Sequence, residues 1–221
     1  MIAMSDLVVD RTNVRPSASQ SSLPERGPPV SGGRGPRLQF STLRPADLFA
    51  MNVQPSQSLV LGMAHSWDQE QAELLTAQPV AWCARSADAA DRGRIIACFG
   101  IVEMFEGSQG YGWAALAPGI GAAHFELTRF VQGQIAGCGL ARLELRAVAS
   151  LAFERDLAAA GGEQADPVRA AFKRPTPEMR WAVLLGLKPV HVLRQYGAAR
   201  EAFVLFELIR PAVAALAREA A

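Results

Sequence analysis

Apolar residues change their spacing twice between positions 80 and 148, and this order restricts the folds open to the chain. Three apolar runs come first, at Val80 to Arg85, Arg94 to Met104 and Tyr111 to Ala117. Their length and composition predict strands, and the segments between them, Asp-Arg-Gly and Glu-Gly-Ser-Gln-Gly, have turn compositions. Because short turns join antiparallel neighbours, the pattern predicts a three-strand meander.

The second change of spacing begins at Ile120. From Ile120 to Ile135 apolar residues recur at helical intervals, until Gly137 and Gly139 end the pattern. Arg142 to Val148 then alternates charged with apolar residues, which is typical of a strand. Since a strand reached through a crossover helix can lie parallel to the one before it, we expect this strand beside Tyr111 to Ala117.

Shorter signals predict further elements on both sides of this unit. In chain order they are a strand at Leu38 to Thr42, a short helix from Pro45, a helix capped by Ser66 that ends at Thr76, a helix from Thr176 to Leu185, and strands at Pro189 to Gln195 and Ala202 to Ile209. The predicted fold class is mixed α/β (α+β). It has a mostly antiparallel central sheet of six to seven strands with helices on both faces.

The composition divides the chain into three parts. Residues 17–37 are dense in Ser, Pro, Gly and Arg and offer too little apolar surface to offset the entropy of ordering them. We therefore expect a flexible N-terminal arm at 1–37 and one domain at 38–210, with an insertion at about 150–175. An Ala-rich helical tail is expected at 211–221.

Charge and cysteine content exclude several classes of protein. A net charge of +1 gives no argument for nucleic acid or an anionic membrane as a partner. No apolar run approaches the roughly 20 residues of a membrane span, and the N-terminus does not read as a signal peptide. The three cysteines have no metal-ligand spacing and are expected to be buried free thiols. They are Cys83, Cys98 and Cys138.

The order of elements resembles the GNAT acyltransferase fold, and three short motifs add to the resemblance. They are the opening Leu43-Arg44-Pro45-Ala46-Asp47, the glycine loop Gly119-Ile120-Gly121-Ala122 and the helix end Leu184-Leu185-Gly186-Leu187. Trp113, Trp181 and the last strand, Phe203 to Phe206, further resemble the GNAT-like internal virion protein A family of tailed phages.

The resemblance implies a cofactor site but leaves it incomplete. If acyl-CoA binds, its pyrophosphate belongs at the glycine loop, where backbone N–H groups and the helix dipole favour negative charge. A tight turn explains such a loop equally well. The family pattern places Arg or Gln where this chain has Leu116, and often a Tyr general acid where it has Ala182. Weak acetyl-CoA binding, or none, is therefore expected. The loop residues are Gly119, Ile120, Gly121 and Ala122.

No catalytic residue is evident elsewhere in the sequence. Glu103 and Glu106 are expected to be solvated at the rim of the sheet, and Tyr111 and Tyr196 to lie on strands. The histidines show no metal-ligand spacing and no neighbouring nucleophile, so structural roles are expected for them. They are His65, His124 and His191. The four tryptophans, Trp67, Trp82, Trp113 and Trp181, are expected to fill the core.

Two functions follow from these observations. The first is a catalytically degenerate, GNAT-like virion or assembly protein of a tailed phage, located in the virion or the bacterial host cytoplasm. Its arm would contact other virion proteins or copies of itself, and it would need no cofactor and no metal. The alternative is an acyl-CoA-dependent N-acetyltransferase that uses acetyl-CoA to modify a protein or a small amine. Fold alone does not choose between them.

Overall fold

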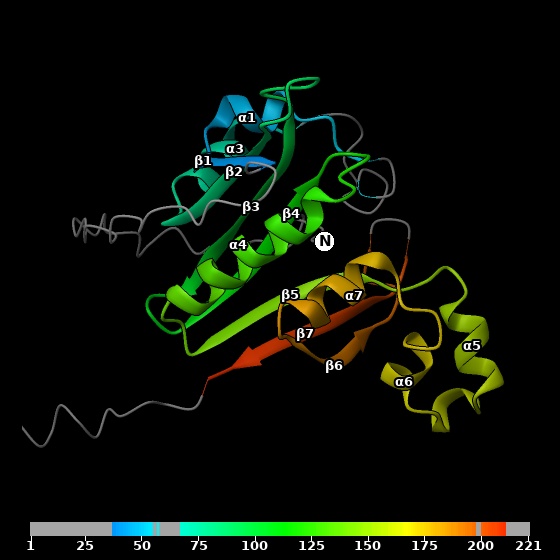
Figure 1. Ribbon diagram of the computed structural model, residues 1–221. Helices are drawn as coiled ribbons and strands as arrows, with labels where there is room; N and C mark the ends of the chain where they lie inside the picture. The colour runs from blue at the N-terminus through cyan, green and yellow to red at the C-terminus, as the bar shows by residue number, and fades with distance from the viewer. Residues whose placement is uncertain (1–36, 55–56, 58–66, 198–199, 211–221) are drawn as a thin grey trace, which may run out of the picture.

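A computed structural model describes residues 37–54, 57, 67–197 and 200–210 (Figure 1). The expected arm, except Arg37, and the expected helical tail at 211–221 lie outside these residues. No helix in the described part of the chain is long and apolar enough to cross a membrane.

Seven strands form one sheet in the order β1-β2-β3-β4-β5-β7-β6 (Figure 1). They are β1 (Leu38–Thr42), β2 (Val80–Ser86), β3 (Ile95–Phe105), β4 (Gln109–Leu116), β5 (Arg142–Val148), β6 (Lys188–Leu193) and β7 (Phe203–Ile209). All neighbours are antiparallel except β4 and β5, which are parallel. The predicted meander and the predicted parallel pair are both confirmed.

The helices that the structure describes pack against different parts of the sheet. They are α1 (Pro45–Phe49), α3 (Gln69–Thr76), α4 (Ala123–Gly137), α5 (Phe153–Ala159), α6 (Pro167–Ala171) and α7 (Pro177–Leu184), with a 3-10 turn at Gly162–Gln164. One apolar cluster lies between α1, α3 and the sheet, and a larger one lies between α4, α7 and the sheet. In the insertion, α6 packs beside β6 and α5 packs against α6.

The start of α3 corrects one expectation. Ser66 lies outside the described residues, and the helix begins at Gln69 with Asp68 as its N-cap. The Asp68 carboxylate accepts a hydrogen bond from the Gln71 backbone N–H at 2.7 Å. Asp caps a helix as well as Ser does, and Trp67 just before it is buried in the core, which fixes where the helix begins.

The register of α4 is the one predicted from its apolar spacing. Leu127, Val131 and Ile135 are all buried in the larger cluster, and Leu127 is fully buried. We therefore expect Leu127→Ala to lower the free energy of unfolding by about 2 to 5 kcal/mol, through lost burial and the cavity left behind.

Urea denaturation measures this loss, and a matched control lies on the same helix. Phe125 is 79% exposed, so Phe125→Ala should change stability by no more than about 0.5 kcal/mol. Equal losses from the two variants would contradict the assigned register.

Candidate functional site

The parallel strands β4 and β5 separate soon after they meet. Their ladder has three residue pairs, Gln109 with Arg142, Gly110 with Leu143 and Tyr111 with Glu144. On its other side β4 stays paired with β3 as far as Leu116. One edge of β4 therefore faces a gap beyond Tyr111.

The backbone on this edge has hydrogen-bond partners at Leu116 and, among the described residues, none at Ala114. The Ala117 N–H donates to the Ile96 carbonyl of β3, so by the alternation of a strand the groups of Leu116 point into the gap. There the Leu116 N–H donates to Gln57 Oε1 at 2.6 Å, and its carbonyl accepts from the Gln54 N–H at 2.9 Å. The Ala114 N–H and carbonyl point the same way, beyond the last β4-β5 pair.

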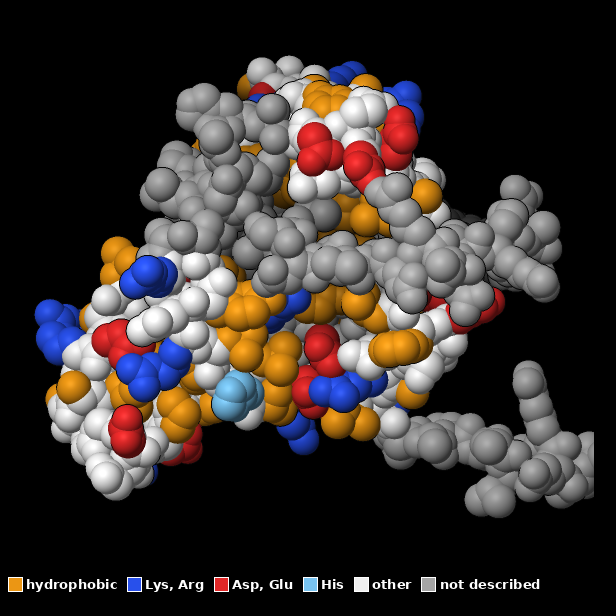
Figure 2. All heavy atoms as spheres, turned by 180° about the vertical axis from the view of Figure 1, so that it is seen from behind, with side chains coloured by type: hydrophobic (Ala, Val, Ile, Leu, Met, Phe, Trp, Pro, Cys, Tyr) orange, Lys and Arg blue, Asp and Glu red, His pale blue; other side chains and the backbone are white. Residues whose placement is uncertain are grey.

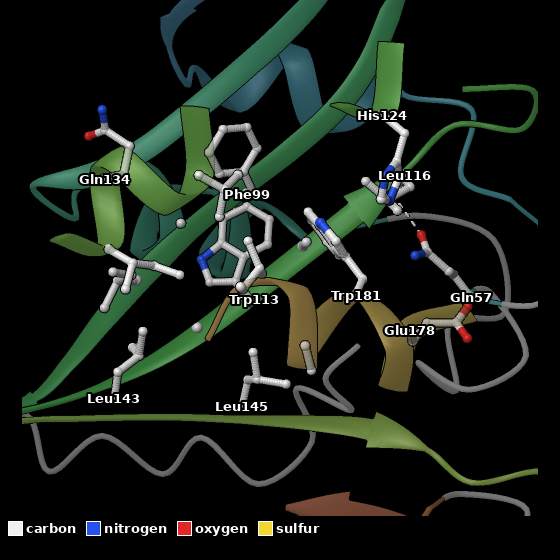
Figure 3. A pocket seen from close by; sticks show the side chains of 18 of the residues that line it. Gln57, Phe99, Trp113, Leu116, His124, Gln134, Leu143, Leu145, Glu178 and Trp181 are labelled. Carbon is white, nitrogen blue, oxygen red and sulfur yellow. Dashed lines mark hydrogen bonds between the residues drawn. The ribbon is translucent and has the colours of Figure 1, made fainter. Parts of the chain in front are cut away.

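A cavity of about 170 Å³ lies in this gap, covered by α4 and α7 (Figure 3). Gly112, which has no side chain, and Ala114 and Ala182, with one methyl group each, line it and leave the space open. Its two ends differ. His124, Gln57 and Glu178 lie together at one end, whereas Leu143 and Leu145 lie at the other (Figure 3).

The glycine loop stands at the entrance of α4, and Ile120 from this loop also lines the cavity. Gly119 and Gly121 have positive φ angles of 74° and 47°, which only glycine adopts without strain. Most of the loop is exposed. Arg94 lies beside it, because its guanidinium donates to the Pro118 carbonyl at 3.4 Å.

His124 is held in place by two neighbouring side chains. The Thr128 hydroxyl donates to the His124 carbonyl at 2.7 Å and accepts from the Trp181 indole N–H at 3.0 Å. Thr128 Oγ1 also lies 3.3 Å from His124 Nδ1. Because the hydroxyl proton is used, Oγ1 can only accept here, which assigns the ring proton to Nδ1 and leaves Nε2 with a free lone pair.

Burial lowers the pKa of His124 from its ordinary value of 6.5. The imidazole is therefore neutral at pH 7, as a proton acceptor has to be. The sequence-based expectation of a purely structural role for His124 missed its position in the cavity lining. Of the other histidines, His191 is exposed on β6 and His65 lies outside the described residues.

The structure brings some of the predicted site residues together and not others. Leu116, Ile120 and Ala182 line the cavity, whereas Gly119, Gly121 and Ala122 of the glycine loop do not. Glu103 is half-buried and Glu106 exposed, and neither lines the cavity.

The two tyrosines lie away from the cavity lining. Their rings stand over the Arg146 guanidinium at 4.6 Å and 4.7 Å. Tyr111 is on β4 as expected, but Tyr196 follows β6 instead of lying on it, because the strand ends at Leu193.

Two of the cysteines and three of the tryptophans are buried, as expected. Cys83 and Cys98 stand opposite each other on β2 and β3, while Cys138 is half-buried on the far side of the sheet. Trp82 is half-buried, whereas Trp113 and Trp181 also line the cavity. Among the described residues, no group of three or more His, Cys, Asp or Glu side chains is arranged to hold a metal ion.

Charges of both signs lie side by side on the face turned away in Figure 1 (Figure 2). Among the described residues, Arg94 forms an ion pair with Asp91 and Arg194 forms one with Glu154. The described part of the face in Figure 2 presents no broad patch of a single charge.

Comparison with known proteins identifies the fold. No protein-family model matches the sequence, and no curated protein is detectably similar to it. Ard1 from Thermoplasma volcanium superimposes with a TM-score of 0.50 at 9% identity, over 79% of this chain and 99% of that one. A protein provisionally named phosphinothricin N-acetyltransferase gives 0.51 at 8% identity, over 78% and 98%. The chain has the GNAT-like fold, and these matches lend no support to the phage virion family.

Proposed function

We propose that the protein binds an acyl-coenzyme A thioester between β4 and β5 and transfers its acyl group to an amine. The observation that carries this proposal is the edge of β4 at Ala114, which has no strand partner among the described residues and faces a cavity with one polar and one apolar end. A protein of the same fold bears the name of an N-acetyltransferase, which supports the proposed class of reaction.

The residues at the cavity mouth fit this cofactor. The exposed N–H groups of the loop from Gly119 to Ala122, at the start of the long helix α4, suit a diphosphate. Arg94, the residue before β3, brings a cation to the same loop and compensates for the Leu116 side chain, which cannot donate. Ala114 offers backbone groups for the amide groups of the pantetheine arm.

Two side chains are placed to handle the proton of an incoming amine. When bound, the acyl thioester supplies an activated carbonyl group. His124 Nε2 accepts the proton from the amine, since the imidazole is neutral and its Nδ1 is held by Thr128. The Glu178 carboxylate, at the same end of the cavity, attracts the positively charged form of the amine.

A second candidate is a non-catalytic role in assembly, including the phage virion role. Two observations favour it. Gln54 and Gln57 already pair with the Leu116 backbone, and Ala182 stands where many GNAT enzymes have a tyrosine general acid. A measurement of acyl-CoA binding distinguishes the acyltransferase function from the role in assembly.

Calorimetric titration with acetyl-CoA tests the proposal, and Ala122 provides a matched pair of variants. Ala122 is the N-cap of α4 and its side chain makes no capping hydrogen bond. In Ala122→Asp a negative charge faces the diphosphate but also complements the helix dipole. We expect affinity to fall about tenfold or more (~1.4 kcal/mol) while thermal stability is kept or raised.

Ala122→Asn is the neutral control, because it has the same shape without the charge, and its affinity should stay close to that of the wild type. Equal acyl-CoA affinities for the Asp and Asn variants would show that the loop does not contact the diphosphate. The absence of saturable binding of any acyl-CoA to the wild type would favour the assembly role.

A further inference from the structure

We infer that Cys83 and Cys98 form a modification site, at which hydrogen peroxide converts two buried thiols into a disulfide that ties β2 to β3. The site is separate from the proposed acyl-CoA site, because neither cysteine lines the cavity. The inference is carried by the register of the two strands, which places the cysteines directly opposite each other.

The backbone directions on β2 and β3 show which kind of cross-strand pair the cysteines form. The Ala81 carbonyl accepts a hydrogen bond from the residue that follows β1, so by alternation the backbone groups of Cys83 also point away from β3. The Ile96 carbonyl accepts from the Ala117 N–H, so those of Cys98 point toward β4. The cysteines are therefore a non-hydrogen-bonded pair, in which the Cα atoms are about 4.5 Å apart and the side chains lie close together.

This separation allows a disulfide with little movement of the backbone. Disulfides join residues whose Cα atoms are about 4.4 to 6.8 Å apart. On β4 the neighbour of Cys98 is Ala115. On β1 the neighbour of Cys83 is Ser41. Small side chains therefore flank the pair within the sheet.

The two thiols differ in acidity, and this difference decides which of them reacts first. A hydrogen bond from the Cys98 thiol lowers the pKa of Cys83, and the same hydrogen bond, together with burial, raises the pKa of Cys98. Because the thiolate is the nucleophile, Cys83 is the residue that attacks the peroxide.

The reaction then takes two steps. The Cys83 thiolate attacks one peroxide oxygen, the O–O bond breaks, and the leaving hydroxide takes up the proton that Cys83 has released, which gives a sulfenic acid and water. The Cys98 sulfur attacks the sulfenic sulfur, the S–S bond forms, and the sulfenic hydroxyl leaves as a second water with the Cys98 proton. Two thiols lose two electrons to one hydrogen peroxide and become one disulfide.

The surroundings of the pair favour a small oxidant. Both cysteines are fully buried in the cluster between α1, α3 and the sheet. Solvent lies one strand away, because Ser41 is exposed on the edge strand β1. Local opening of α1, which has five residues, gives hydrogen peroxide a further route. We therefore expect oxidation to be slower than that of an exposed thiol and faster than global unfolding.

Treatment of the full-length native protein with hydrogen peroxide tests the inference, and tryptic mapping without reduction locates the product. Arg85 and Arg94 lie between the cysteines, so trypsin releases Cys83 and Cys98 on separate peptides. We expect these peptides to stay joined, with the mass of two hydrogen atoms lost, and to separate in dithiothreitol. Because the disulfide closes a loop of about 15 residues, the melting temperature should rise by about 5 to 10 °C and return on reduction.

The third cysteine provides a matched control. Cys138 is half-buried and does not belong to the cluster around the pair, so Cys138→Ser should show the same joined peptides and the same thermal shift as the wild type. In Cys98→Ser the sulfenic acid of Cys83 has no thiol partner. It should therefore react with dimedone, and the melting temperature should not rise.

Three outcomes would overturn the inference. They are thiols at Cys83 and Cys98 that stay free in peroxide, joined peptides that contain Cys138 in place of either one, and a disulfide that appears only after unfolding in urea. The wild-type peptide map decides the question by itself if a variant does not fold. No acyl-CoA enters the experiment, so its result does not depend on the proposed function.

Discussion

Replacement of His124 by glutamine is expected to slow acyl transfer about 10²- to 10⁴-fold, the usual contribution of a positioned general base. Glutamine is close to histidine in size and polarity but cannot take a proton near neutral pH. Acyl-CoA affinity should change little, because the proposed cofactor contacts come from Ala114 and the glycine loop. A loss in rate without a loss in affinity is the expected signature.

The role of His124 also predicts the direction in which the rate of acyl transfer changes with pH. The rate needs neutral His124, so it should rise with pH through the pKa of this residue and level off above it. Since burial lowers that pKa, the midpoint of the rise should lie below 6.5. The rise should be absent from the residual activity of His124→Gln.

Release of free coenzyme A thiol measures the rate against a panel of amines. His191→Gln is the matched control, because His191 is exposed on β6 and does not line the cavity, so its rate should match that of the wild type. Full activity of His124→Gln in a protein that transfers acyl groups would show that another group accepts the proton.

Loss of the Asp47 carboxylate is expected to destabilise the protein strongly. Asp47 is 2% exposed, and it accepts hydrogen bonds from Arg85 Nη2 at 2.5 Å and from the Arg44 backbone N–H at 3.0 Å. Asp47→Ala leaves the Arg85 guanidinium next to the core without its partner. Breaking such a pair costs about 3 to 5 kcal/mol, and the lower figure is expected because Arg85 is 26% exposed.

Urea denaturation of Asp47→Ala measures this cost, and Glu154→Ala is its control. Glu154 pairs with Arg194 at 2.8 Å, but both side chains are about half exposed, so water replaces the lost partner and the loss should be much smaller. Similar losses from the two variants would mean that burial does not set the strength of the Asp47 pair.

The sequence could indicate the order of the elements because regular elements leave local patterns. Alternating residues marked Arg142 to Val148 as a strand, and helical spacing marked the buried face of α4 through Leu127, Val131 and Ile135. These patterns depend on neighbours within one element, so they are visible without the rest of the fold. The parallel β4-β5 pair followed from the helix between the two strands.

The residues of the cavity could be anticipated only in part. Ile120, Leu116 and Ala182 were found through the resemblance of short motifs. Gln54, Gln57 and Glu178 were not, because a buried glutamine in a connecting segment or a glutamate in a first helical turn has no distinguishing local pattern. Gln57 is 1% exposed, and its Oε1 accepts a hydrogen bond from the Leu116 N–H, a contact between residues 59 positions apart.

The sequence by itself determined which segments become strands and helices, which face of α4 is buried and which strands are neighbours in the meander. The tertiary structure decided how far β4 and β5 stay together, which side of the gap His124 faces and how much space Gly112, Ala114 and Ala182 leave between them. The physical reason is how far apart in the sequence the contacting residues lie. Periodicity records contacts along one element, whereas a cavity is what remains after several elements distant in sequence have packed against one another.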